Sequence, residues 1–385
     1  MTARLLAQDL IQRPHAPLQL DQPLEPEAIP TPALLLDRRL LSSNLQRMQN
    51  WLTSHGKAMR PHGKTHKCPE IARQQLAAGA IGICVAKLSE AVVMANAGVG
   101  PILITSPLTM PDKVQVLNDL LLQECDIALV VDSEWGLAEL RAGLSDDARL
   151  DVIIDLDVSM GRTGNRDVDQ VARLIDGIAE TGNLTFKGFQ HYAGHVMHKA
   201  PWQERRDASL ELWQEIEQRI SALGVGYEVV TGAGTGTFDI DTEVSSLTDL
   251  QVGSFIFMDE EYRQIGSQSG DRFEEFDVSL FVAVSAISNP QASTITMDGG
   301  FKSMASDTVP PVCDDLADSK YRFAGDEHGV LIGETAVQSV RLGDVVKLVA
   351  PHCDPTVNLH DFFWVIEEDG LVHSRWPITG RGCTW

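Results

Sequence analysis

The feature that most constrains the fold is a regular alternation of short apolar runs and longer amphipathic segments, from Ala33 to about residue 265. The apolar runs lie at residues 33–37, 58–64, 81–87, 102–106, 127–132, 152–158, 186–192, 227–232 and 250–258. The segments between them have helical spacing; in 200–223, one stripe contains Leu210, Trp213, Ile216 and Ile220. This alternation predicts parallel βαβ units, and the last eight runs can close a (β/α)8 barrel of the TIM type.

The pattern changes after about residue 270, where short strands and turns replace the alternation. This texture predicts a smaller domain with an antiparallel sheet. We therefore expect a Pro-rich N-terminal arm or linker at 1–30, an α/β barrel at 31–265 and a C-terminal antiparallel β domain at 266–385. The run at 33–37 is one strand more than the barrel needs, so we expect it to join the sheet of the β domain.

The charge of the chain restricts its partners. The formal net charge is −23, which argues against nucleic acid or an anionic membrane as a partner. No segment reaches the roughly 18 apolar residues of a membrane span, and the first twenty residues lack the apolar core of a signal peptide. The six cysteines include no CxxC pair. We expect a cytoplasmic protein with reduced thiols.

Polar and glycine-rich clusters follow five of the eight predicted barrel strands. Their sequences are HGKTHK (62–67), DLDVSMGRTG (155–164), FQHYAGHVMH (189–198), TGAGTGTFD (231–239) and QVGSF (251–255). The carboxyl ends of barrel strands converge on one rim, where barrel enzymes place their chemistry. Each cluster alone is compatible with a polar turn, but their convergence predicts a functional site on this rim.

Two of these clusters indicate specific chemistry. Lys64 follows a predicted buried strand, where a lysine is unfavourable unless it is paired or used covalently, for instance in a Schiff base with an aldehyde. A solvated turn containing Lys64, His66 and Lys67 is the alternative. The glycines of GAGTGT (232–237) allow backbone N–H groups to approach an anion, and TIM barrels often bind a phosphate at this position.

A third cluster, APHCDPTVNLHD (350–361), lies in the predicted β domain. If this segment is a strand, His352 and Asp354 share one side of it and Cys353 faces the other. A histidine and a carboxylate suit a divalent ion such as Mg, Mn or Zn. A polar turn is again the alternative.

Together the motifs resemble the metal-activated pyridoxal 5'-phosphate (PLP) enzymes of the alanine-racemase-like fold, namely D-threonine aldolases, 3-hydroxy-D-aspartate aldolases and their D-serine dehydratase relatives. The resemblance runs from about residue 29 to 382. It rests on RPHGKTHKCPEIA, ICVAKLSEA, DVSMGRTG, GAGTGT, LQVGSFIFMD, DEHG and PHCDPTVNLHD. It implies a PLP-binding barrel, a C-terminal β domain and a homodimer in which the partner chain closes each active site.

The resemblance also implies roles for individual residues. Lys64 would carry PLP, Arg162 would bind its phenolic oxygen, and His198 would be the base for the substrate's β-hydroxyl. The remaining contacts to PLP would come from His62, Tyr192, Thr231, Gly234, Thr235, Gly236, Gln251, Gly253 and Ser254. The divalent metal would be bound by His352 and Asp354. Gln251 stands where alanine racemases carry an arginine, and a glutamine cannot protonate the pyridine nitrogen, which disfavours simple racemisation.

The activity implied by the resemblance is cleavage of a D-3-hydroxy amino acid, such as D-threonine or 3-hydroxy-D-aspartate, to glycine and an aldehyde. The spacing H-x-D at 352–354 fits the aldolases, whereas the dehydratases tend to carry H-x-C. A dehydratase of D-serine or D-threo-3-hydroxyaspartate, releasing a 2-oxo acid and ammonia, is the alternative. A non-catalytic PLP-binding protein is a third possibility, but the small relatives of that kind lack a C-terminal domain.

Three further residues bear on the substrate. His191 and His195 stand where the aldolases often have other residues, and His195 is expected to reshape the substrate pocket. A substrate with a side-chain carboxylate would require a cation near its β-carbon, for which Lys302 is a candidate.

Overall fold

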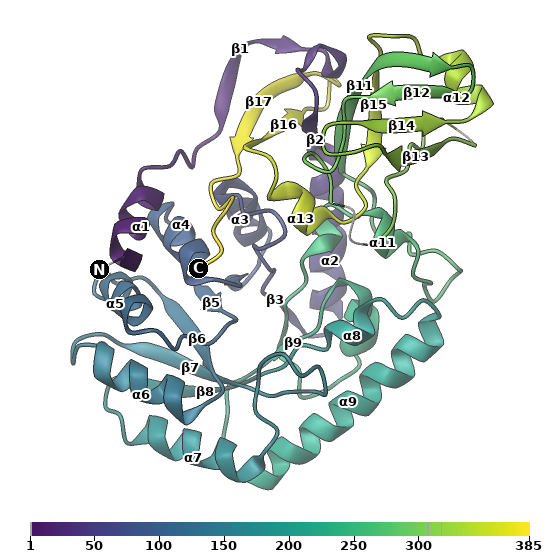
Figure 1. Ribbon diagram of the computed structural model, residues 1–385. Coiled ribbons are helices and arrows are strands. Elements are labelled where there is room, and N and C mark those ends of the chain that lie inside the picture. The colour runs from purple at the N-terminus through teal and green to yellow at the C-terminus, as the bar shows by residue number, and fades with distance from the viewer. Residues whose placement is uncertain (1, 306–307, 317) are drawn as a thin grey trace.

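The computed structural model describes residues 2–305, 308–316 and 318–385, and it contains a parallel barrel and a separate sheet (Figure 1). This confirms the predicted (β/α)8 barrel with a C-terminal β domain. The barrel strands are β3 (Ala58–Met59), β4 (Ile83–Val85), β5 (Ile102–Ile104), β6 (Ile127–Val131), β7 (Leu150–Asp155), β8 (Leu184–Gln190), β9 (Val229–Gly232) and β10 (Asp249–Leu250). Their order is β3-β10-β9-β8-β7-β6-β5-β4, with every pair parallel.

The barrel closes between the segments that carry its first and last strands in this order. Cys84 donates its backbone N–H to Pro61 O (2.8 Å), and Gly63 donates to Cys84 O (2.7 Å). An isolated parallel bridge joins His62 to Cys84. These contacts fix the loop after β3, which contains Lys64, to the wall of the barrel.

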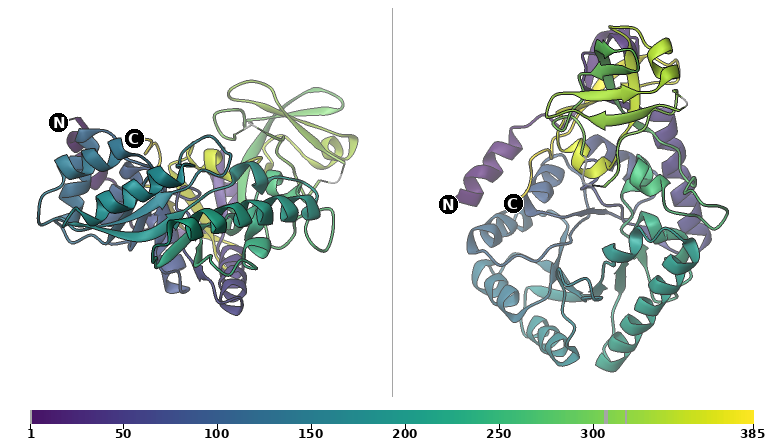
Figure 2. Two further views of the ribbon diagram at one scale, coloured as in Figure 1. Left: turned by 90° about the horizontal axis from the view of Figure 1, so that it is seen from below. Right: turned by 45° about the vertical axis from the view of Figure 1, so that its right-hand side comes forward.

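Helices surround the barrel on its outer face (Figure 2, right). They are α2 (Arg38–Ser54), α3 (Pro69–Ala77), α4 (Leu88–Asn96), α5 (Pro111–Leu121), α6 (Glu134–Gly143), α7 (Val168–Ala179) and α9 (Trp202–Leu223). The stripe predicted for the last of these is real: Trp213, Ile216 and Ile220 are buried against the barrel. Short helices occupy the loops at one end of the barrel, namely α8 (Gly194–Met197), η2 (Thr235–Thr237), α10 (Phe238–Asp241), η3 (Ser254–Ile256) and α11 (Glu260–Arg263).

The second sheet has nine strands in the described part of the chain. They are β1 (Leu18–Leu24), β2 (Ala33–Asp37), β11 (Leu280–Gln291), β12 (Thr294–Met297), β13 (Lys320–Phe323), β14 (Gly329–Ile332), β15 (Val345–Val349), β16 (Phe362–Ile366) and β17 (Val372–Pro377), accompanied by η1 (Pro26–Ala28), α12 (Glu334–Ser339) and α13 (Cys353–Val357). Strand β2 lies between β11 and β16, so the extra strand of the alternating pattern belongs to this sheet. All its pairs are antiparallel except β2 with β16.

The first 30 residues, for which the sequence indicated an arm or linker, contain regular structure. Helix α1 (Thr2–Ile11) packs against α4 and α5, and β1 pairs with β17 at the edge of the second sheet. Ala3, Ala7 and Leu10 are the buried residues of α1, at the spacing of one helical face. The apolar stripe is narrow, which is why the segment looked poorly periodic.

Several barrel strands are shorter than the apolar runs from which they were predicted. The run at 250–258 continues as strand only to Leu250, after which residues 254–256 form the 3-10 helix η3. Phe255 and Phe257 are nevertheless fully buried, because Phe255 packs on Phe276 and Phe257 packs on Phe363 of the β domain. The Phe257 and Phe363 rings lie 5.4 Å apart across the boundary between the barrel and the β domain. The end of β10 therefore anchors the two parts of the molecule to each other.

Candidate active site

A cavity of about 480 Å³ opens at the carboxyl ends of the barrel strands. The cavity is lined by His62, Lys64, Thr65, Ala86, Lys87, Thr105, Ser106, Pro107, Arg162, Thr163, Gln190, Tyr192, Gly234, Thr235, Gln251, Gly253, Ser254 and Tyr262. Most of the residues predicted to hold a cofactor are among them. Thr231 and Gly236 are not in the lining and lie directly behind it.

Lys64 connects the barrel to the β domain inside this cavity. Its Nζ lies 3.5 Å from Oδ2 of Asp354, a residue of α13, and 39% of its side chain is exposed. Burial by itself would lower the pKa of Lys64, but the Asp354 carboxylate and the Tyr192 hydroxyl raise it overall. Burial likewise would raise the pKa of Asp354, and the Lys64 and His352 charges lower it overall. The two groups therefore form an ion pair.

His62 and Tyr192 line the cavity near Lys64. His62 is buried, and its Nε2 lies 3.2 Å from Thr105 Oγ1. Burial, reinforced by the Lys64 charge, lowers the pKa of His62 well below its usual value, so the ring is neutral at pH 7. Tyr192 lies under two cations, with Arg162 Cζ 5.1 Å and Lys64 Nζ 5.9 Å from its ring centroid.

Two loops that line the cavity contain glycines that let them pack closely against neighbouring side chains. A Cβ on Gly234 would come within 2.9 Å of Met197 Sδ, and one on Gly253 within 2.6 Å of Thr65 Oγ1. These loops begin the 3-10 helices η2 and η3, whose first N–H groups have no partner within the helix. Thr235 Oγ1 accepts a hydrogen bond from Phe255 N (3.1 Å) and ties the loops together. This arrangement fits the phosphate of PLP.

Gly236, unlike Gly234, does not line the cavity. A Cβ on Gly236 would lie 2.1 Å from the backbone oxygen of Met197, so this glycine allows η2 to pack against α8. It supports the cradle without facing the cavity. Its prediction as a residue that contacts the cofactor is therefore not met by the cavity lining.

Gln251 lies on the floor of the cavity within a chain of hydrogen bonds. Its Nε2 donates to Gln190 Oε1 (3.0 Å) and to Thr231 Oγ1 (3.1 Å). Both amide hydrogens are thereby used, so only the acceptor Oε1 remains for a bound ring. Thr231 in turn donates to Asp249 Oδ1 (2.6 Å), which explains its position behind the wall.

The predicted metal ligands His352 and Asp354, like the predicted base His198, are not among the lining residues; Asp354 and His198 contact the lining residues Lys64 and Tyr262. The sequence predicted that His352 and Asp354 share one side of a strand, but this segment is not a strand. Strand β15 ends at Val349, His352 caps α13, and Pro355 is tolerated because it falls in the first helical turn. His352 and Asp354 keep 25% and 17% of their side chains exposed. Cys353 is buried, and burial raises the pKa of its thiol well above the usual value.

The donor set at this position is small. Within residues 2–305, 308–316 and 318–385, no three histidine, cysteine or carboxylate side chains form a ready-made metal site. A divalent ion held by His352 and Asp354 would therefore take its other ligands from water and substrate, as an open catalytic site does. One nitrogen and one carboxylate donor are suitable ligands for Mn, Mg or Zn.

His198 follows α8 and lies over Tyr262, with 4.5 Å between the ring centroids. Its Nδ1 is 3.7 Å from Oε1 of Glu261. Burial, together with the charge of His352, lowers the pKa of His198 to about 4. The ring is therefore neutral at pH 7 and has a lone pair that can accept a proton.

Some expected residues lie elsewhere. His191 is buried outside the cavity, with its ring 4.1 Å from that of Trp213 in α9. His195 is exposed and does not belong to the lining. Lys302 is exposed and pairs with Glu327 at 2.5 Å, also outside the lining. The lining therefore provides no support for the expected effects of His195 and Lys302 on the substrate pocket.

Other residues of the site were not assigned a role from the sequence. Lys87 and Gln190 line the cavity, and each lies within or next to a quoted motif. Tyr262 and Glu261 belong to MDEEY (258–262), which follows the 3-10 helix η3. Three acidic residues directly after the end of the predicted strand at 250–258 could have indicated a role for this segment. The residues that Glu261 contacts, His198 and His352, come from distant parts of the chain, so the sequence alone does not reveal them.

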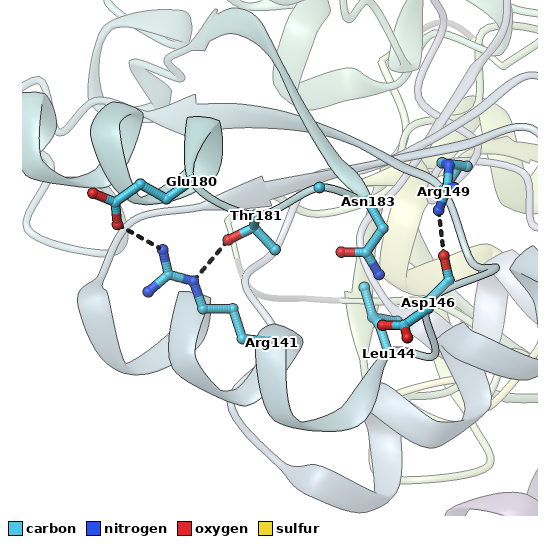
Figure 3. A pocket seen from close by; sticks show the side chains of 8 residues that line it. Arg141, Leu144, Asp146, Arg149, Glu180, Thr181 and Asn183 are labelled. Carbon is cyan, nitrogen blue, oxygen red and sulfur yellow. Dashed lines mark hydrogen bonds and ion pairs between the residues drawn. The ribbon is translucent and has the colours of Figure 1, made fainter.

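A second cavity lies at the opposite end of the barrel (Figure 3). Its volume is about 570 Å³, and the segments 144–149 and 180–183 that line it precede β7 and β8. Figure 3 shows Arg141 directed at Glu180 and Thr181, and Arg149 at the backbone of Asp146. These groups pair with one another, so this cavity has no converging donors for a ligand.

Comparisons with known proteins agree with this geometry. The family model of the alanine racemase N-terminal domain matches residues 36–261, and a serine dehydratase domain matches residues 279–366. The chain is 36% identical to a D-threonine aldolase of an Arthrobacter species, over 94% of this chain and 95% of that protein. It is 31% identical to a 3-hydroxy-D-aspartate aldolase of Paracoccus denitrificans (strain Pd 1222), over 93% and 94%.

A solved structure agrees equally well. The crystal structure of a D-threonine aldolase from Filomicrobium marinum superposes with a TM-score of 0.90 at 33% identity, covering 97% of this chain and 100% of that chain. No helix among the described residues has the length and apolar character to cross a membrane.

Proposed function

The chain belongs to the family of the D-threonine and 3-hydroxy-D-aspartate aldolases, whose barrel is an alanine racemase N-terminal domain, and from this we propose that it is a PLP- and divalent-metal-dependent aldolase. It cleaves D-3-hydroxy amino acids between Cα and Cβ, giving glycine and an aldehyde. The single observation that carries the proposal is the 3.5 Å contact between Lys64 of the barrel and Asp354 of the β domain. If Lys64 holds the cofactor and Asp354 binds the metal, this contact brings both beside the same part of the substrate, which supports the proposal.

The residues of the cavity are suited to hold PLP. The loops at Gly234 and Gly253 would hold its phosphate, Arg162 and Tyr192 would contact its ring, and Lys64 would provide the amine that binds its aldehyde. When bound, PLP withdraws electrons from the α-carbon of an amino acid attached to it. Gln251 offers the ring an acceptor and no proton, which favours a reaction assisted at the β-hydroxyl over racemisation.

The residues on the other side of the cavity act on the β-hydroxyl. We assign His352 and Asp354 as ligands of a divalent ion, whose chemistry is to lower the pKa of a bound hydroxyl. His198 accepts the hydroxyl proton, because its pKa of about 4 leaves it unprotonated at neutral pH. Different domains would thus act on the two ends of the reacting bond. Lys64 of the barrel would act at the α-amino group, and His352 and Asp354 of the β domain would act at the β-hydroxyl.

A dehydratase is the second candidate, because residues 279–366 match a serine dehydratase domain. A dehydratase would use the same residues to expel the β-hydroxyl and release a 2-oxo acid. Asp354, at the position where dehydratases tend to carry cysteine, favours the aldolase. We also propose, from the family resemblance, that the protein is a homodimer. It would work in the cytoplasm, where the six free cysteines stay reduced.

The test is a comparison of substrates. The purified protein, supplied with PLP and Mn²⁺, is incubated with D-threonine, 3-hydroxy-D-aspartate and D-serine, and glycine, aldehyde and 2-oxo acid are assayed in parallel with and without EDTA. Glycine with an aldehyde, lost in EDTA and restored by Mn²⁺, is the expected result. A 2-oxo acid with ammonia and no glycine would replace the aldolase by the dehydratase.

A further inference from the structure

Helix α11 joins the barrel to the segment of the β domain that contains the proposed metal ligands (Figure 1). Its backbone N–H groups at Glu260 and Glu261 donate to Ala350 O (3.0 Å) and Pro351 O (3.1 Å). In return, Cys353 N donates to Oδ2 of Asp259 (2.8 Å), the residue that caps α11. Three hydrogen bonds thus fix the segment 350–353 to this one turn of helix.

The same turn contacts the proposed base. The Tyr262 ring packs on His198 with 4.5 Å between centroids. One carboxylate lies between the base and the metal ligand: Glu261 Oε1 is 3.7 Å from His198 Nδ1, and Glu261 Oε2 is 3.5 Å from His352 Nδ1. Only 16% of the Glu261 side chain is exposed, so this carboxylate is held between the two rings.

We propose that Glu261 is a positioning residue that orients His198 and His352 together. The inference rests on the proposed function, since it assigns the two histidines as base and metal ligand. A carboxylate next to Nδ1 favours the tautomer in which Nδ1 carries the hydrogen, and this leaves the lone pair on Nε2. A base and a metal ligand both need that lone pair, and one carboxylate provides it in both rings.

The distances agree with this role. At 3.5 and 3.7 Å, both contacts are slightly longer than a formed hydrogen bond. Catalytic hydrogen bonds are commonly long in a free enzyme and shorten when the ligands are in place. A metal on His352 would draw its ring into one orientation, and through Glu261 the position of His198 would follow.

The neighbouring Glu260 supplies a matched control. It belongs to the same helix and is also buried, but its carboxylate lies 3.4 Å from Arg263 and 3.7 Å from Arg272, on the other side of the turn. Glu260→Gln therefore removes the same charge from the same helix without changing the carboxylate beside the two histidines.

The experiment measures metal binding separately from turnover. Mn²⁺ is titrated by calorimetry into PLP-saturated wild type, Glu261→Gln, Glu261→Ala and Glu260→Gln, and kcat and KM for D-threonine are then measured at saturating Mn²⁺. We expect Mn²⁺ affinity to fall about 10–100-fold in both Glu261 variants and to stay near wild type in Glu260→Gln. At saturating Mn²⁺, kcat stays low while KM changes little, because His198 is still misaligned.

The outcomes separate the two proposals. If the wild type binds Mn²⁺ and both Glu261 variants bind it equally well with an unchanged kcat, the role of Glu261 is overturned while the aldolase proposal stands. A wild type that binds no Mn²⁺ would overturn the metal-dependent function itself. Glu261→Gln has nearly the shape of the native side chain, so it decides the question if Glu261→Ala does not fold, as monitored by thermal unfolding.

Discussion

The two ends of the barrel carry cavities of similar size but very different lining. At the carboxyl ends of the strands, a cavity of about 480 Å³ receives side chains from the barrel loops, and Asp354 of the β domain reaches Lys64 within it. At the amino ends, a cavity of about 570 Å³ is lined by arginines and carboxylates that pair along its own wall (Figure 3). Volume therefore does not distinguish the functional end.

The two cavities differ in the residues that their loops contribute. The loops at the carboxyl end contain Gly234 and Gly253, which line the cavity and whose missing side chains let the loops pack closely against Met197 and Thr65. The ion pair of Arg141 with Glu180 at the other end is solvent-exposed, with 39% and 78% of the two side chains accessible. Exposed pairs of this kind contribute little to stability. The following predictions test this contrast, beginning with the largest expected effect.

If Lys64 binds the cofactor covalently, as proposed, Lys64→Ala should abolish turnover, with kcat reduced on the order of 10⁴-fold or more. The cofactor should also be lost on dialysis, which absorbance of the dialysed protein measures.

Lys67, three residues further on, is the control for this prediction. It is buried and pairs with Glu90 at 2.6 Å. Lys67→Met should destabilise the fold by about 3 kcal/mol, since it leaves a buried carboxylate unpaired, yet the folded protein should keep its cofactor. Retention of cofactor and activity by Lys64→Ala would remove the distinction between the two lysines.

His198→Ala should lower kcat by about two to four decades if the residue is the general base. On the proposed assignment, the proton of the β-hydroxyl then has no acceptor at the right place, while Lys64 is still present to bind the cofactor. Steady-state kinetics with D-threonine at saturating Mn²⁺ measure the effect, and cofactor retention shows that the site is otherwise intact. An unchanged kcat would reject the assignment.

The sequence predicted the fold and half of the residues that line the cavity because both follow from local patterns. The alternation located every barrel strand, and motifs such as HGKTHK and GAGTGT placed Lys64 and Gly234 at strand ends. The predicted ends of the strands were less accurate: the run at 250–258 is strand only to Leu250, and Phe257 is buried against Phe363 of the β domain rather than in the barrel sheet. Apolar character alone cannot separate these two kinds of burial.

The contacts across domains could not be predicted from local patterns. The pairing of Lys64 with Asp354, and the position of Glu261 between His198 and His352, depend on how the β domain packs on the barrel. The side of the strand to which a side chain points also decides its role. His191 lies between Gln190 and Tyr192, which line the cavity, and it therefore points outward to the helices.

Because His191 points away from the cavity, its titration should affect the stability of the fold and not catalysis. Burial lowers the pKa of His191 to about 3, whereas an unfolded chain titrates near 6.5. Between these values the unfolded state binds more protons, so stability is complete above about pH 6.5 and is lost as the pH falls. Between pH 7 and pH 5, the titration of His191 alone should lower the free energy of unfolding by about 2 kcal/mol.

His191→Gln removes the titrating group, so its free energy of unfolding should fall less than that of the wild type between pH 7 and pH 5. Urea unfolding at the two pH values measures the difference. Equal losses in the two proteins would show that His191 is already protonated in the folded state or is accessible to water. At pH 7 the variant should keep its kcat, because His191 faces α9 and not the cavity.

The smallest effect is expected at the amino end of the barrel. Glu180→Ala removes the carboxylate that lies 3.8 Å from Arg141, but Arg141 Nε still donates to Thr181 Oγ1 (2.8 Å). Because the pair is exposed, the free energy of unfolding should change by less than about 0.5 kcal/mol, and kcat should stay within about twofold of wild type. Urea unfolding and steady-state kinetics check both values. A loss of activity comparable to that of His198→Ala would mean that this end communicates with the site, and the contrast between the two cavities would fail.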